Sequence, residues 1–80
     1  QVVPTEQLRE RALEYAAHIA SLAPLSVRAS VRMAREYRMQ SAGALADYAW
    51  QMWQPVYESE DAQEGPRAFA EKRKPMWQGR

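Results

Sequence analysis

The sequence predicts an all-α fold, with three longer helices and a short helical C-terminal tail that together form one helical segment over residues 1–80. Apolar residues recur at helical spacing along most of the chain, and no strand-like alternation appears after Val3. The stretches between these periodic segments are short, which favours neighbouring helices that pack against one another.

The first helix is expected to begin at Thr5, a suitable N-cap residue, and to end at Pro24. Its apolar face repeats at one side of a 3.6-residue period and consists of Leu8, Ala12, Tyr15, Ala16, Ile19, Leu22 and Ala23. A second helix is expected to run from Ser26, acting as its cap, to about Met39.

A third helix is expected after a break at residues 41–43. Its apolar stripe consists of Leu45, Ala49, Met52, Trp53 and Val56. Because Pro55 lacks a backbone N–H and clashes with the carbonyl four residues earlier, this helix is expected to kink or end near Gln54.

The C-terminal tail is expected to contain two short helical pieces. Ser59 is positioned to cap the first piece, which runs to about Glu64 and is broken by Gly65. Pro66 suits the first turn of the second piece, which is expected to end near Arg73.

The composition excludes several kinds of site. Cysteine is absent and His18 is the only histidine, so this chain offers no disulfide, no Cys/His zinc pattern and no multi-histidine metal site. A net charge of +1 argues against a general nucleic-acid binder. No secretion signal and no apolar run of membrane-spanning length is visible, which predicts a soluble, cytoplasmic protein without membrane association.

No residue is expected to be catalytic. His18 has no serine or cysteine partner at a suggestive spacing, and it is interpreted as a packing or surface residue. Four carboxylates lie close together but surround the start of a short helix, where the helix dipole favours solvated acids: Glu58, Glu60, Asp61 and Glu64. The three glycines are isolated, so there is no phosphate-binding loop.

Two further patterns leave alternatives open. An arginine stripe on the second helix either faces solvent or follows the phosphates of a nucleic acid: Arg28, Arg32, Arg35 and Arg38. Large side chains around the third helix exceed what so small a core can hide, which indicates an interface: Tyr48, Trp50, Met52, Trp53 and Tyr57. A stand-alone helical interaction module that binds through this Trp/Tyr cluster is the main alternative function.

The pair Phe69 and Lys72 is the candidate ligand-binding feature. The two residues are three apart, so on one helix the ring and the ammonium group would point to the same side. An apolar ring beside a cation suits a nucleotide, because the ring packs against a base and the cation meets a phosphate. An amphipathic helix gives the same spacing, so the pair alone does not identify a nucleotide site.

The ordered tail carries a resemblance. It resembles the C-terminal pattern S-x-D-A-x-E-G-x-x-A-F-x-E-K-R-x-P-x-W/F-x-G of the enoyl-CoA hydratase/isomerase (crotonase) family. The matching residues are Ser59, Asp61, Ala62, Glu64, Gly65, Ala68, Phe69, Glu71, Lys72, Arg73, Pro75, Trp77 and Gly79. The stretch from Leu22 to Val27 resembles a second family segment. The chain departs from the family at Ser30-Val31-Arg32, where a lysine is usual, and at Pro66, which is uncommon after the glycine.

The resemblance implies a C-terminal segment whose helices lie in an open arrangement on a larger catalytic core. That core, with its oxyanion-hole amides and catalytic glutamates, is absent from this chain, which is therefore expected to be inactive alone. The parent enzyme would act on acyl-CoA thioesters by hydration or isomerisation, with no cofactor beyond the CoA substrate. The implied partners are the rest of the enzyme and neighbouring subunits of a trimer or hexamer, where Phe69 and Lys72 would hold the CoA nucleotide.

Overall fold

The computed structural model describes residues 1–80 and is entirely helical, as the sequence predicts. A single 3-10 turn, η1 (Thr5–Gln7), leads into α1 (Leu8–Ala20). Two longer helices follow, α2 (Pro24–Glu36) and α3 (Ala42–Tyr57). The last helix, α4 (Glu60–Ala70), is followed by ten residues without regular structure, here named the C-terminal strap (residues 71–80).

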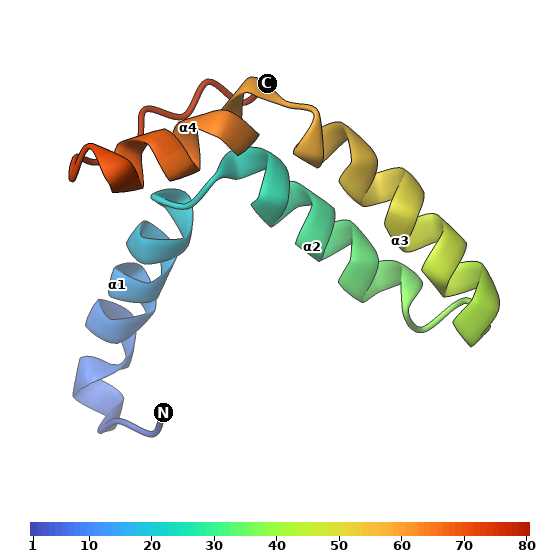
Figure 1. Ribbon diagram of the computed structural model, residues 1–80. Helices are drawn as coiled ribbons and strands as arrows, with labels where there is room; N and C mark the ends of the chain where they lie inside the picture. Colours follow the sequence, from blue (N-terminus) through green and yellow to red (C-terminus); the bar gives the residue numbers. More distant parts are fainter.

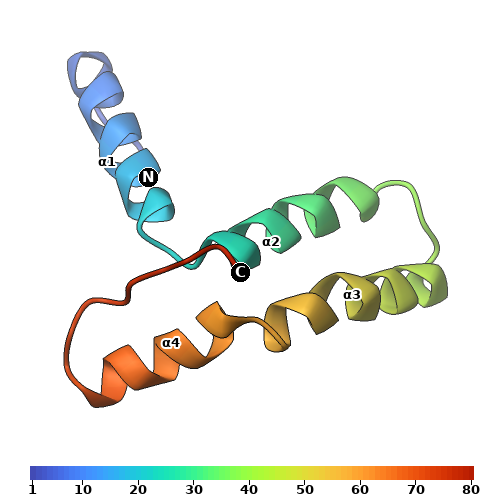
Figure 2. The ribbon, with the colours of Figure 1, turned by 90° about the horizontal axis from the view of Figure 1, so that it is seen from above.

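The helices form an open, flat arrangement that measures 43 × 39 × 17 Å. The antiparallel helices α2 and α3 lie side by side, while α1 points away from them at a steep angle (Figures 1 and 2). The chain turns after α3 into α4, and the C-terminal strap runs back toward the start of α2 (Figure 2). The prediction of an open arrangement is therefore confirmed.

The chain has almost no interior of its own. Only three of its 80 residues are buried, Ala29, Asp61 and Ala68, and none of them is a large apolar residue. Side chains that normally fill a core are exposed along α1, α2 and the turn between them, including Leu8, Leu13, Tyr15, Ile19, Leu22 and Val31. Apolar surface on this scale marks a face that another body covers.

Two of the predicted helix starts are wrong. Thr5 makes no side-chain cap, and the chain instead enters through η1, where the Gln7 N–H donates to the Pro4 carbonyl at 2.9 Å. Helix α2 begins at Pro24 rather than at Ser26, and it ends at Glu36 rather than near Met39. Proline suits the first helical position because its φ is already helical and its missing N–H would have no partner there.

Serine residues cap the last two helices. The predicted cap at Ser59 is confirmed, since its hydroxyl accepts from the Ala62 N–H at 3.1 Å. Ser41 caps α3 in the same way, accepting from the Ala44 N–H at 3.4 Å. The predicted break at residues 41–43 is therefore a helix start, and Gly43 lies inside α3.

The predicted helix end near Gln54, the break at Gly65 and the new helix start at Pro66 are also wrong, while the kink predicted at Pro55 stays a prediction. Helix α3 passes through Pro55 to Tyr57, and α4 is one helix that includes Gly65 and Pro66. A proline removes one helical hydrogen bond while its φ stays helical, so a helix held by its other bonds continues. Beyond Pro55, for example, the Glu58 N–H still donates to the Gln54 carbonyl at 3.1 Å.

Gly65 is expected to accept alanine. A Cβ built at this residue would lie 3.5 Å from the Trp77 ring, an ordinary contact distance. Since alanine favours a helix over glycine by about 1 kcal/mol, Gly65→Ala should raise the helix content of this chain. Far-ultraviolet circular dichroism measures that content. The control Gly79→Ala should give no gain, because Gly79 has a φ of +73°. A loss of helix in Gly65→Ala would contradict this account.

Candidate functional site

The candidate nucleotide-binding residues lie at the C-terminal end of α4. Phe69 is in the last turn and 87% exposed, so its ring stands free of the rest of the chain. Helix α4 ends at Ala70, however, and Lys72 lies beyond it with a φ of 54°. The expectation that both residues share one face of a single helix is therefore wrong, and a turn sets their relation.

That turn is a Schellman motif built on Lys72. The Lys72 N–H donates to the Phe69 carbonyl at 3.2 Å, and the Arg73 N–H donates to the Ala68 carbonyl at 3.0 Å. The left-handed position of this motif usually holds glycine, and another residue there costs about 1 kcal/mol. The turn ties the backbone of Lys72 directly to that of Phe69.

Lys72 is an unpaired cation in a region rich in ion pairs. Arg73 pairs with Glu64 and, at 2.6 Å, with Glu71, and Arg80 pairs with Glu60 at 3.1 Å. Lys72 takes part in none of the ion pairs of this chain. Its ammonium group is thus available to an external anion.

Glu64 is an ionised carboxylate beside this turn. The hydrogen bond from Arg73, followed by that from the Met76 backbone, lowers the pKa of Glu64 to about 2. The same contact with Glu64 raises the pKa of Arg73. Arg73 is therefore occupied by two carboxylates of its own chain, Glu64 and Glu71.

Asp61 anchors the end of the C-terminal strap. Its carboxylate accepts from the backbone N–H of Gln78 at 2.7 Å and of Gly79 at 2.8 Å. Its own backbone N–H donates to the Arg80 carbonyl at 3.0 Å. The expectation of a solvated acid at the start of the helix is wrong for Asp61, which is only 4% exposed.

Trp77 connects the strap to the other end of the chain. Its indole N–H donates to the Ser21 carbonyl at 2.9 Å, across 56 residues of sequence. The ring also borders an apolar groove between α1 and α2, lined by Ile19, Leu22, Ala23, Ser26, Val27, Ser30 and Val31. No sequence pattern pointed to this contact, because its acceptor is a backbone carbonyl and its donor lies in an irregular segment.

The predicted interface residues are only partly brought together. Trp53 and Tyr57 form a tilted aromatic pair with ring centroids 6.4 Å apart and an interplanar angle of 40°. Trp50 and Tyr57 are exposed, whereas Tyr48, Met52 and Trp53 are half-buried. Their role as an interface stays a prediction.

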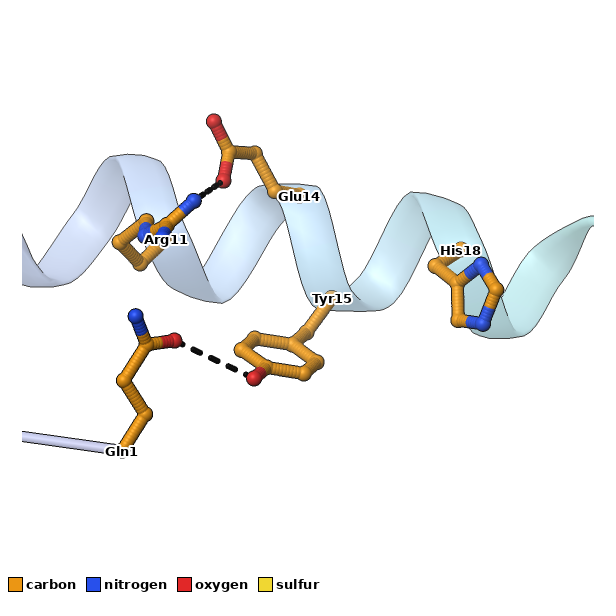
Figure 3. A pocket seen from close by; sticks show the side chains of 5 residues that line it. All are labelled: Gln1, Arg11, Glu14, Tyr15 and His18. Atoms are coloured by element: carbon orange, nitrogen blue, oxygen red, sulfur yellow. Dashed lines mark hydrogen bonds and ion pairs between the residues drawn. The ribbon is translucent and has the colours of Figure 1, made fainter.

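A shallow polar hollow of about 190 Å³ lies on α1 and is lined by Gln1, Arg11, Glu14, Tyr15 and His18 (Figure 3). Arg11 pairs with Glu14, and the Tyr15 hydroxyl donates to the Gln1 side chain at 3.2 Å. His18 makes no side-chain hydrogen bond within the hollow (Figure 3). His18 therefore forms no hydrogen-bonded pair with a carboxylate in this hollow.

The predicted arginine stripe is exposed and forms no ion pair. Arg28, Arg32 and Arg35 lie on α2, whereas Arg38 lies beyond the end of that helix. The structure contains no group of three or more His, Cys, Asp or Glu side chains placed to hold a metal ion. None of the helices combines the length and the apolar character that crossing a membrane requires.

Curated proteins are similar in sequence to this chain over nearly all of its length. Enoyl-CoA hydratase EchA19 of Mycobacterium tuberculosis is 43% identical over 79 residues, which cover 99% of this chain and 30% of that protein. Carnitinyl-CoA dehydratase of Salmonella typhi is 42% identical over 89 residues, covering 100% of this chain and 32% of that protein. The chain thus spans about a third of the length of the curated relatives it matches.

Solved protein structures contain a segment with the same fold as this chain. A probable enoyl-CoA hydratase/isomerase from Mycobacterium abscessus matches with a TM-score of 0.88 and 39% identity, over 100% of this chain and 32% of that one. Enoyl-CoA hydratase from Bacillus anthracis matches with a TM-score of 0.91 and 34% identity, over 99% and 31%. The sequence model of the enoyl-CoA hydratase/isomerase family matches residues 1–80. This chain therefore belongs to the enoyl-CoA hydratase/isomerase family.

Proposed function

We propose that this chain is the C-terminal helical segment of an enoyl-CoA hydratase/isomerase-like enzyme acting on acyl-CoA thioesters. In that enzyme it covers part of the CoA site and supplies contacts between subunits. The names of the relatives above refer to CoA compounds, and the family match extends over the whole chain. That extent favours a segment of an enzyme over a stand-alone interaction module.

One observation carries the CoA-binding part of the proposal. A hydrogen-bonded turn joins an exposed aromatic residue, Phe69, to an unpaired cation, Lys72. The nucleotide end of CoA offers the complementary chemistry, since adenine has an apolar face and the attached phosphates are anionic. Neither residue is suited to move a proton at carbon, so we assign them to substrate binding and not to the chemical step.

The subunit-contact part rests on exposed apolar surface. The segment leaves whole helix faces uncovered, and its large aromatic residues are the kind that dominate interfaces. We propose that the remaining part of the enzyme and neighbouring subunits, in a trimer or hexamer, cover these faces. Within them we assign subunit contacts to Tyr48, Trp50, Met52, Trp53 and Tyr57. The proposed reaction requires no cofactor beyond the CoA thioester substrate.

Lys72→Ala in the full-length enzyme tests the CoA assignment. An exposed contact between a cation and a phosphate contributes about 1 kcal/mol, equally to the ground state and the transition state. We therefore expect KM for the CoA thioester to rise roughly fivefold with kcat unchanged, and the effect to shrink with added salt. A pantetheine thioester, which lacks the nucleotide, should show no change.

Lys74→Ala is the matched control, because Lys74 is also an exposed, unpaired lysine of the strap. It should leave both KM values unaltered. Equal effects of Lys72→Ala on the two thioesters, or a loss of kcat alone, would show that Lys72 does not hold the nucleotide.

A further inference from the structure

The C-terminal strap is held by two carboxylates of α4. Asp61 binds its far end, as described above, and Glu64 binds its near end. The Glu64 carboxylate accepts from both terminal nitrogens of Arg73, with Nη2 at 3.2 Å, and from the Met76 N–H at 3.0 Å. We name the Glu64–Arg73 pair the buckle, because it closes the chain on itself across nine residues.

The buckle encloses the turn that carries Lys72. Glu64 lies in the middle of α4, and Arg73 is the residue directly after Lys72. The left-handed backbone at Lys72 is unfavourable for a residue with a side chain, so it persists only where surrounding contacts impose it. The two backbone bonds of the Schellman turn impose it from one side, and the buckle imposes it from the other.

The buckle is well suited to such a role. The side chain of Glu64 is 14% exposed and that of Arg73 is 34% exposed, so solvent reaches the pair only in part. The contact uses two guanidinium nitrogens, which fixes the orientation of Arg73 as well as its distance from Glu64. A pair of this kind holds its geometry better than an ordinary exposed ion pair.

We infer that Glu64 and Arg73 are positioning residues that hold the Lys72 turn in place beside Phe69 for the nucleotide end of a CoA thioester. The inference rests on the proposed function, and it adds that the site depends on two residues that do not touch the ligand. Arg73 is a cation next to Lys72, yet its task is to bind Glu64 and not the phosphates. Without the buckle, the turn samples other conformations and the bound one is only partly populated, which weakens apparent affinity.

Glu64→Gln in the full-length enzyme tests this inference. The amide keeps an acceptor for the Met76 N–H but removes one of the two carboxylate charges that hold Arg73, leaving only that of Glu71. We expect KM for the CoA thioester to rise about threefold to fivefold at unchanged kcat, with no change for the pantetheine thioester. A general structural defect would instead affect both substrates alike.

Glu60→Gln is the matched control. Glu60 is another glutamate of α4 in an ion pair with a strap arginine, but it lies at the opposite end of the helix and is largely exposed. It should leave both KM values as they are. If Glu64→Gln does not fold, Arg73→Lys keeps the positive charge and loses the two-nitrogen contact, and about a twofold selective rise is expected.

The outcomes separate the two proposals. If Glu64→Gln leaves KM for the CoA thioester unchanged while Lys72→Ala raises it, the positioning role of the buckle is wrong and the CoA assignment of Lys72 stands. If Glu64→Gln raises KM equally for the CoA thioester and the pantetheine thioester, the positioning role is also wrong. If Lys72→Ala and Phe69→Ala both leave KM for the CoA thioester unchanged, the CoA assignment itself is wrong.

Discussion

Asp61→Ala is expected to lower the stability of the full-length enzyme by about 3 kcal/mol. The substitution leaves the backbone N–H groups of Gln78 and Gly79 without their acceptor, and hydrogen bonds to a charged group contribute about 1.5–3 kcal/mol each. It also removes a negative charge from the first turn of α4, a further loss of about 0.5 kcal/mol. Exposure of the freed amides to water offsets part of this sum.

The measurement is the midpoint of thermal unfolding. It should fall by about 6 °C or more, because 1 kcal/mol shifts the midpoint by about 2–4 °C in a protein of roughly 150–250 residues. Glu60→Ala is the control, because the Glu60–Arg80 pair is more than two-thirds exposed at both side chains and such pairs contribute about 0.5 kcal/mol. Asp61→Asn should fall between the two, since an amide offers one acceptor oxygen. If Asp61→Ala and Glu60→Ala melted together, the strap would not depend on its carboxylate anchor.

The isolated 80-residue chain is expected to show neither a cooperative melt nor hydration of an enoyl-CoA. With three buried residues, none of them large, burial of apolar surface cannot offset the conformational entropy lost on folding. The chain also lacks an acid–base pair that could act on a thioester, because Glu14 is held by Arg11 and His18 has no such partner.

Calorimetry and an enoyl-CoA hydration assay on the purified chain check this prediction. A broad transition without a heat-capacity peak is expected, with turnover at the uncatalysed rate. A sharp transition would show that the segment is an independent domain. Turnover that survives removal of any full-length enzyme would refute the assignment of this chain to a non-catalytic segment.

The helical class and the caps of the last helix could be predicted from the sequence, because they depend on local features. The 3.6-residue repeat of apolar side chains marks each helix, and the serine at position 59 is bonded to an amide three residues away. The helix end predicted at Pro55 and the helix break predicted at Gly65 were wrong because each residue weakens a helix only locally. The other bonds of the helix decided the outcome.

The geometry of the candidate site was not predictable from its residue types. Spacing and the family resemblance singled out Phe69 and Lys72, whose role stays a prediction, but their spatial relation depends on a left-handed residue at which glycine is usual and which no sequence pattern indicates. Asp61 was misassigned because its partners are backbone amides 17 and 18 residues away. Backbone donors have no side-chain signature, so no pattern of residue types identifies them.

The strap's anchors also determine how freely this region can change during evolution. The backbone anchors of the strap join a particular carboxylate, on Asp61 or Glu64, to a backbone amide that nearly every amino acid possesses. Mutations at Met76 and Gln78 can therefore accumulate without loss of the contact, whereas mutations at the two acids cannot. At these two positions the cost of sequence drift falls on the helix and not on the strap, whereas Arg73 and Trp77 are held through their side chains and stay constrained.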